Sequence, residues 1–363
     1  QELGLDRPIV EPSDLPEGMR IPVLGDAYLD PLFRAADVSP GATPSEESWW
    51  HDVPVRDDMN TFLAGYLTSP QATQAPLLVL GHPGSGKSVL TRVLAARLPA
   101  SDFLVVRVIL REVPADMDLQ DQVEQAIRHM TGERLEWPAL VRSAGTALPL
   151  VLLDGFDEML QATGVSQTDY LMKIREFQRR EAAQGRPVAV IVTSRITVAD
   201  RARIPDDTVA VRLEPFSPDQ VTAWLDMWRE TNERYFRDRG LTALPAKTAM
   251  IYPELSEQPL LLLMLALYDA DDNVLQHDTE KFSRADLYER LLVRFARREI
   301  ERYHPAGVDQ AIEVELGRLS VTAFAMFNRA SQWVTEADLD RDLTVLLGSR
   351  WRTTEAQLSL IHI

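Results

Sequence analysis

The sequence contains no cysteine. This absence excludes disulfide frameworks, thiolate metal sites and cysteine nucleophiles, and it is typical of a reducing compartment. Long apolar runs are also missing: a membrane span needs ~20 apolar residues, and the most apolar stretch, Pro259–Tyr268, is half as long. The N-terminus lacks the charged start and apolar core of a signal peptide. We therefore expect a cytoplasmic protein with no membrane segment.

Runs of Lys and Arg are absent as well, and the formal net charge is −17. A nucleic-acid surface normally gathers basic residues, so we expect no direct contact with DNA or RNA. The 363 residues can form two or three domains, and the apolar content of 45% is ordinary for a globular protein.

The two ends of the chain have an unusual composition. Residues 1–48 are rich in Pro, Gly, Asp and Glu with little periodicity, which predicts an extended linker or strap. The chain starts with Gln and stops within an apparent domain, so we expect a fragment of a longer protein. Residues 358–363 have two interpretations, the start of a strand or a non-native translated adaptor sequence, and no inference rests on them.

Apolar strands and amphipathic helices alternate between Pro76 and Pro215. This alternation predicts an α/β domain with a parallel sheet that helices cover on both faces. The predicted strands are Leu77–Leu80, Phe103–Leu110, Leu150–Leu153, Val188–Thr193 and Val209–Leu213, and the predicted helices are Lys87–Leu98, Leu119–Met130 and Tyr170–Glu181.

After Pro215 the strand pattern stops and only helical periodicity remains. Ser217 and Gln220 form a predicted capping box around a Pro at the first helical position. Further helices are predicted at Pro259–Tyr268, after a cap at Ser283, from Ile312 to Phe327, and after Thr335. An all-helical region therefore follows the α/β domain.

The segment Gly81–Ser88 matches the P-loop pattern G-x-x-x-x-G-K-[ST] in full. Its glycines allow successive N–H groups to face phosphates at the positive end of the following helix. Lys87 is expected to reach the β- and γ-phosphates, and Ser88 to ligate Mg²⁺. The alternative is a glycine-rich turn without a ligand, which the preceding strand and following helix disfavour. The expected phosphate-binding residues are Gly81, His82, Pro83, Gly84, Ser85, Gly86, Lys87, Ser88 and Val89, with His82 a solvated spacer.

A buried strand delivers Asp154 at its carboxyl end, where open α/β sheets place their ligands. Asp154 is suited to hold Mg²⁺, directly or through water. Asp157 and Glu158 are expected on the following loop, where a carboxylate could polarise the attacking water. The alternative is that these two acids cap or solvate the start of a helix.

Thr193, Ser194 and Arg195 end another buried strand. If this strand lies beside the Asp154 strand, Arg195 would lie near the γ-phosphate and could stabilise charge in the transition state. The alternative is a surface arginine paired with a nearby acid. The additional strand Phe103–Leu110, between the P-loop and Asp154, resembles the additional-strand class of P-loop ATPases and not the kinase or GTPase class.

These motifs together resemble the NACHT family of STAND signalling ATPases. The resemblance rests on Leu-Leu-Asp154-Gly-Phe-Asp157-Glu158, on Thr-Ser-Arg195, on Leu213-Glu-Pro-Phe216-Ser and on Gln258-Pro259-Leu-Leu-Leu, and it spans roughly Trp49 to Leu346. It implies a nucleotide-binding domain at 49–215, a helical domain at 216–305 and a partial winged-helix domain at 306–363.

The family resemblance also implies a function. ADP would hold a closed state, ATP exchange would permit self-association, and hydrolysis would be slow, as in bacterial anti-phage proteins and NOD-like receptors. Pro259 would approach the base or ribose; the alternative is a proline at a helix's first turn. No residue matches the family's winged-helix histidine. The effector and sensor domains of such proteins are not recognisable in this chain.

Two other functions fit the same motifs. One is an AAA+-like motor, which predicts constitutive rings and fast hydrolysis; the acidic charge and the lack of an evident pore-loop pattern argue against it. The other is a non-hydrolysing scaffold that keeps nucleotide as a structural cofactor.

Overall fold

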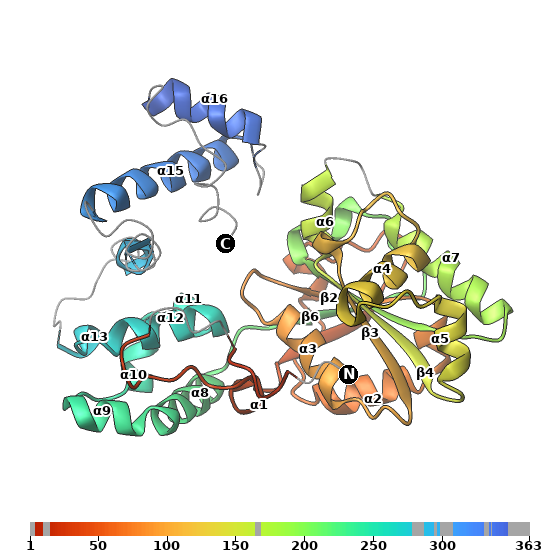
Figure 1. The fold of residues 1–363 in the computed structure, drawn as a ribbon, viewed down its shortest axis with the longest axis horizontal. Coiled ribbons are helices and arrows are strands. Elements are labelled where there is room, and N and C mark those ends of the chain that lie inside the picture. The colour runs from red at the N-terminus through yellow and green to blue at the C-terminus, as the bar shows by residue number, and fades with distance from the viewer. Residues whose placement is uncertain are drawn as a thin grey trace. The chain divides into compact units, whose positions relative to one another are not determined.

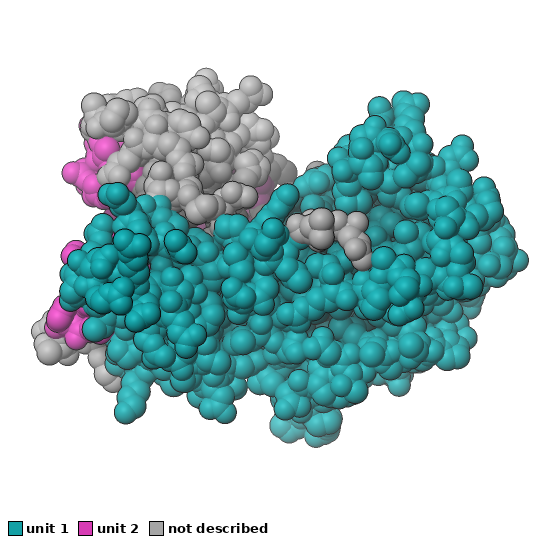
Figure 2. All heavy atoms as spheres, turned by 60° about the horizontal axis from the view of Figure 1, so that its bottom comes forward, with its two compact units in different colours: residues 1–266 teal, residues 267–363 magenta. Residues whose placement is uncertain are grey.

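The computed structural model describes residues 4–9, 15–163, 168–277, 287–293, 296–297, 308–329, 334 and 336–347. The chain divides into two compact units, residues 1–266 and 267–363, which Figure 2 shows in different colours. Among the helices of the described ranges, none is long and apolar enough to cross a membrane.

A six-stranded sheet forms the centre of the first unit, in the order β1-β6-β2-β5-β4-β3 (Figure 1). The pairs from β6 to β3 are parallel, as predicted. The strands are β1 Phe33–Asp37, β2 Leu77–Gly81, β3 Phe103–Ile109, β4 Leu148–Asp154, β5 Ala189–Arg195 and β6 Val209–Leu213. Strand β5 lies between β2 and β4, whereas β3 forms an edge of the sheet.

The other edge of the sheet carries a sixth strand that was not predicted. Strand β1 pairs antiparallel with β6, with Phe33 opposite Leu213 and Asp37 opposite Val209. This strand lies in the segment that we expected to be a linker, and it has almost no apolar alternation. It depends on its partner: Arg34 of β1 and Arg212 of β6 both bind the Glu214 carboxylate, at 3.2 and 2.7 Å.

Helices cover both faces of the sheet, as predicted (Figure 1). Because side chains alternate along a strand, odd and even residues enter two separate cores. One core joins Leu78 and Val151 to helices α4 to α7, and the other joins Leu77 and Leu150 to α2 and α3. These helices are α2 Met59–Leu67, α3 Lys87–Arg97, α4 Leu119–Thr131, α5 Trp137–Ser143, α6 Phe156–Thr163 and α7 Tyr170–Ala183.

Helix α6 corrects a second expectation. We placed Asp157 and Glu158 on a loop, but both lie in the first turn of α6. Gly155, at φ 87°, makes the turn between β4 and this helix, so the two acids follow Asp154 with no intervening loop. Acidic residues are favourable there because a helix N-terminus is electropositive.

The described elements after Leu213 are all helical. The predicted capping box is present: Ser217 Oγ accepts a hydrogen bond from the Gln220 N–H, and Gln220 Oε1 accepts one from the Ser217 N–H.

The remaining described helices of the chain, before and after Leu213, are α1 Leu24–Ala27, α8 Pro218–Thr231, α9 Glu233–Arg239, α10 Ala246–Ala249, α11 Pro253–Ser256, α12 Pro259–Asp269, α13 Val274–His277, α15 Val308–Asn328 and α16 Glu336–Leu347. Short 3-10 helices lie at Glu47–Trp50, Pro70–Thr73, Leu110–Glu112 and Ile196–Arg201.

Three predictions fall outside the described residues. These are the cap at Ser283, the helix start at Thr335 and the interpretation of residues 358–363. The described part of the second unit contains helices α13, α15 and α16 and the helical residues 287–293. It does not confirm a winged-helix domain.

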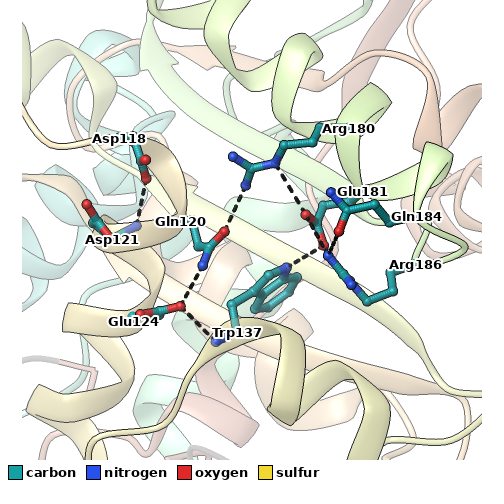
Figure 3. Close-up of polar contacts among 9 residues, drawn as sticks. All are labelled: Asp118, Gln120, Asp121, Glu124, Trp137, Arg180, Glu181, Gln184 and Arg186. Atoms are coloured by element: carbon teal, nitrogen blue, oxygen red, sulfur yellow. Dashed lines mark hydrogen bonds and ion pairs between the residues drawn. The ribbon is translucent and has the colours of Figure 1, made fainter.

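A buried carboxylate joins the helices on one face of the sheet. Glu181 of α7 is 1% exposed, and its carboxylate accepts hydrogen bonds from Trp137 Nε1 of α5 at 3.1 Å and from Arg186 Nε at 2.9 Å. Figure 3 shows Arg180 on the same carboxylate, and Glu124 of α4 bound to the Trp137 backbone. A buried ionised group needs such partners, so this network fixes α5 against α4 and α7.

We predict that Glu181→Ala lowers the free energy of unfolding by roughly 3 kcal/mol, because it leaves the buried indole N–H and the Arg186 guanidinium without their acceptor. The control is Arg180→Ala at the exposed rim of the network, which costs less than about 1 kcal/mol. Chemical denaturation of the two variants and the parent measures both losses. Equal, small losses would show that the network does not fix α5.

Candidate functional site

The predicted site residues meet at one edge of the sheet. Strand β2 ends at Gly81, β4 at Asp154 and β5 at Arg195, and the three strands are parallel neighbours. Gly81 lies opposite Arg195 in the register of β2 and β5. Because carboxyl ends of parallel strands face the same side, the three motifs form a single site there. The Arg195 strand lies beside the Asp154 strand, which is the condition under which Arg195 was expected near the γ-phosphate.

The loop between β2 and α3 has the backbone that its glycines permit. Gly84 and Gly86 have φ of 77° and 90°, a left-handed conformation that other residues rarely adopt. A Cβ on Gly81 would lie 2.5 Å from Ser85 Oγ, so a side chain at 81 would displace Ser85. The exposed side chain of His82 agrees with a spacer role. The loop leads directly into α3, whose N-terminus attracts anions.

Lys87 at the start of α3 lies folded over the loop. Its Nζ donates hydrogen bonds to the carbonyl oxygens of Gly81 at 3.0 Å and His82 at 2.9 Å. The pKa of the Lys87 ammonium is lowered to about 8, chiefly by burial and to a smaller degree by the Arg195 charge, whereas the Asp157, Asp154 and Glu158 charges act in the opposite direction. A bound polyphosphate would supply the negative charge that this buried cation lacks.

Asp154 is 4% exposed and is held through both carboxylate oxygens. Its Oδ1 accepts hydrogen bonds from Ser88 Oγ at 3.0 Å and Thr193 Oγ1 at 2.7 Å. A hydroxyl and a carboxylate are hard oxygen donors of the kind that Mg²⁺ prefers, so the pair fits the predicted ion. Within the described ranges there is no group of three or more His, Asp or Glu residues placed to hold a metal. Mg²⁺ usually keeps several waters and substrate phosphates among its ligands, which a site with two protein oxygens leaves room for.

Arg107 of β3 also reaches this site, although it was not among the predicted site residues. Its Nη2 lies 2.6 Å from Asp154 Oδ2, and its Nε donates to Thr91 Oγ1 of α3 at 3.1 Å. The available signal was an arginine in the middle of the otherwise apolar strand Phe103–Ile109. It could be interpreted only once the register placed β3 beside β4.

The two acids after Asp154 have different surroundings. Asp157 is 4% exposed. Its carboxylate accepts a hydrogen bond from the backbone N–H of Arg195 at 3.1 Å and pairs with the Nε of Arg195 at 2.8 Å. Arg195 is thus paired with an acid, Asp157, although its side chain is only 28% exposed and not the surface group of the alternative. Glu158 is 39% exposed along its side chain and meets Arg111 Nη1 at 3.3 Å. Asp157 is therefore a fixed ion-pair partner, and Glu158 is accessible.

The start of α12 lies against the phosphate loop. A Cβ on Gly84 would lie 3.4 Å from Leu260 Cβ and 3.7 Å from Gln258 Oε1. Pro259, the first residue of α12, stands between these two contacts in the sequence. This places the predicted nucleotide-contacting proline next to the loop; its contact with a base or ribose remains a prediction.

Comparison with known proteins gives structural matches only. No family model matches the chain, and no curated protein matches it in sequence. Similar solved structures include AMPPCP-bound DnaA from Aquifex aeolicus, at 12% identity over 80% of this chain and 86% of that chain, with a TM-score of 0.38. Another is the Aeropyrum pernix ORC2 protein in its ADPNP–ADP complexes, at 12% identity over 91% of this chain and 89% of that chain, with a TM-score of 0.42. A third is Hsp104 with ATPγS and casein, at 12% identity over 79% and 52%, with a TM-score of 0.37.

The fold is therefore assigned from the chain's own structure. The mostly parallel sheet, the helices on both faces and the glycine-rich loop between β2 and α3 make the first unit an α/β P-loop NTPase fold. The resemblance to the NACHT family stays a prediction from the motifs.

The lowered pKa of Lys87 predicts a specific pH dependence of stability. Between about 8 and 10.5 the unfolded lysine binds a proton that the folded one has lost, so stability rises with pH across this window. Relative to a Lys87→Met variant, the nucleotide-free protein should gain roughly 3 kcal/mol between these limits. Denaturant titrations of both proteins across this pH window measure the difference in their free energies of unfolding. Titratable groups other than Lys87 are common to both proteins, so their contributions cancel in this difference. Parallel stability curves would contradict the lowered pKa.

Proposed function

We propose that this protein is an ATP- and ADP-binding switch that hydrolyses ATP slowly with Mg²⁺. The observation that carries the proposal is the convergence, at the carboxyl ends of β2, β4 and β5, of the phosphate loop, Asp154 and Arg195. These are the groups that phosphoryl transfer needs: a phosphate cradle, a metal-binding carboxylate and a cation for the transferred phosphoryl group.

The phosphate loop and Lys87 would bind the polyphosphate. The loop N–H groups and the N-terminus of α3 form a cradle for anions. Lys87 Nζ now hydrogen-bonds to the carbonyls of Gly81 and His82, and it can exchange these neutral acceptors for charged phosphate oxygens. A phosphate oxygen carries negative charge that a carbonyl oxygen lacks, so the added Coulomb attraction to the ammonium favours the bound state.

Ser88 and Asp154 would hold Mg²⁺, which supplies neutralisation of phosphate charge when bound. Glu158 is the better candidate for polarising the attacking water, because its carboxylate is accessible and its partner Arg111 is 62% exposed. Asp157 would act differently: it holds Arg195 at the end of β5 through two contacts. Arg195 is then positioned to sense or stabilise the γ-phosphate.

A switch requires that ATP and ADP bind two conformations with different affinity. The closeness of Leu260 and Gln258 to Gly84 supports the start of α12 as the element that responds, because a ligand in the loop would lie beside it. We propose that nucleotide exchange controls self-association in a NACHT-type protein of defence or innate-immune signalling in the cytoplasm, with effector and sensor functions supplied by further domains or partners.

The strand order and the loop favour an AAA+-like motor equally, since the chemistry of the sheet edge is shared. A motor turns over ATP rapidly in response to a macromolecular substrate and forms rings without activation. A scaffold would keep nucleotide without hydrolysing it. Nucleotide content and turnover therefore separate the three functions.

The first test is to purify the protein without added nucleotide, denature it and identify what is released by chromatography. We expect stoichiometric ADP. Lys87→Ala should lose bound nucleotide, with an affinity about 10- to 100-fold lower, since it removes charge-assisted hydrogen bonds to phosphate. The control is Lys173→Ala, an exposed lysine on α7. Equal nucleotide content in Lys87→Ala and the parent would refute the phosphate site, and an empty site with fast turnover would favour the motor.

We further expect Glu158→Gln to slow ATP hydrolysis about 100-fold or more while nucleotide affinity stays near that of the parent, because a water-polarising base acts in the transition state. Glu176→Gln, an exposed acid on α7, is the matched control. Single-turnover hydrolysis and equilibrium binding measure the two effects. If Glu158→Gln changes neither turnover nor assembly, the scaffold function replaces the switch.

A further inference from the structure

Arg107 is a largely buried cation whose position the proposed function does not by itself explain. Its side chain is 10% exposed and lies between β3 and α3, where it binds Asp154 Oδ2 at 2.6 Å and Thr91 Oγ1 at 3.1 Å. Its neighbours in the strand, Val106 and Val108, enter the core on the opposite face. Arg107 therefore lies on the face of the sheet that carries α3, directly behind the carboxylate expected to hold Mg²⁺.

Stability alone is a weak reason for this ion pair. Replacing a buried ion pair with apolar residues of similar volume is often neutral or stabilising. The rest of β3 is apolar, so an apolar residue would fit the strand pattern at 107. An effect of Arg107 on the chemistry of Asp154 is the better explanation for a buried arginine here.

The two oxygens of Asp154 have separate partners. Oδ1 faces the hydroxyls of Ser88 and Thr193, and Oδ2 faces Arg107. Two consequences follow. The carboxylate is fixed with one oxygen directed toward Ser88, and its negative charge is already balanced before any metal ion arrives. A cation that approaches Ser88 gains less from a balanced carboxylate than from a free one.

We propose that Arg107 is a positioning residue that acts through Asp154 as a fixed counter-cation and lowers the affinity of this site for Mg²⁺. The ion is then held mainly by the phosphates of the bound nucleotide, and a nucleoside diphosphate binds with little dependence on Mg²⁺. The inference rests on the proposed nucleotide site.

The test measures the affinity for ADP with Mg²⁺ and with a chelator, and takes the ratio as the coupling between metal and nucleotide. Arg107→Gln removes the charge and keeps a donor, so its coupling should exceed that of the parent by about 10-fold, because Mg²⁺ then meets a carboxylate whose charge is not already balanced. Arg107→Lys keeps the charge and should stay within about threefold of the parent. Arg128→Gln, exposed on α4, is the matched control.

A second measurement uses Mg²⁺ alone, without nucleotide. The Tm of Arg107→Gln should rise more with added Mg²⁺ than that of the parent, because Asp154 has lost its counter-charge. A coupling or Tm response of Arg107→Gln equal to or below that of the parent overturns the proposal. If neither the parent nor any variant binds ADP, the nucleotide site itself is refuted, and the Tm response to Mg²⁺ still decides the role of Arg107.

A variant pair keeps the proposal testable if Arg107→Gln does not fold. Asp154→Asn and Asp154→Asn/Arg107→Gln should show the same coupling, since Arg107 acts through the charge of Asp154. The double variant removes both charges together, which avoids an unpaired buried ion. A difference between these two proteins would show that Arg107 acts on the metal by another route, and would overturn the proposal.

Discussion

The structure of the site depends on the buried carboxylate of Asp154. It joins four elements, because β4 carries it, Ser88 of α3 and Thr193 of β5 bind one oxygen, and Arg107 of β3 binds the other. A buried carboxylate that lost these partners would carry an uncompensated charge. A one-residue slip of β3 or β5 would turn Arg107 or Thr193 to the other face of the sheet. The polar contacts of Asp154 therefore specify the same strand register as the two apolar cores.

The same residues explain how an acidic chain can offer a site to an anion. The whole chain has a net charge of −17. At the carboxyl edge of the sheet, however, three carboxylates each pair with an arginine, as Asp154–Arg107, Asp157–Arg195 and Glu158–Arg111. The opposite charges within each of these pairs cancel, and Lys87 adds a further positive charge beside the glycine-rich loop. The net charge of a chain governs its long-range attraction to partners, whereas the local balance of charges decides which ligand fits the site.

The adjacent acids Asp157 and Glu158 illustrate how one motif acquires two roles. Successive residues of a helix point about 100° apart, so in the first turn of α6 one side chain turns inward and the other outward. Asp157 meets the backbone and guanidinium of Arg195, and Glu158 remains accessible beside Arg111. An isolated sequence motif contains both carboxylates but not this difference in burial, which separates a fixed partner from a candidate base.

The sequence by itself determined the features that depend on local chemistry: the glycine-rich loop between a strand and a helix, the capping box of Ser217 and Gln220, and five of the strands of the sheet. Periodicity and backbone preference act over a few residues, so they can be interpreted without a fold. Only the tertiary structure decided that residues 33–37 form a strand, since that strand depends on β6. It also decided that Asp157 pairs with Arg195 and that Arg107 meets Asp154. These contacts join segments distant in the chain, and strand register, which no local pattern specifies, brings them together.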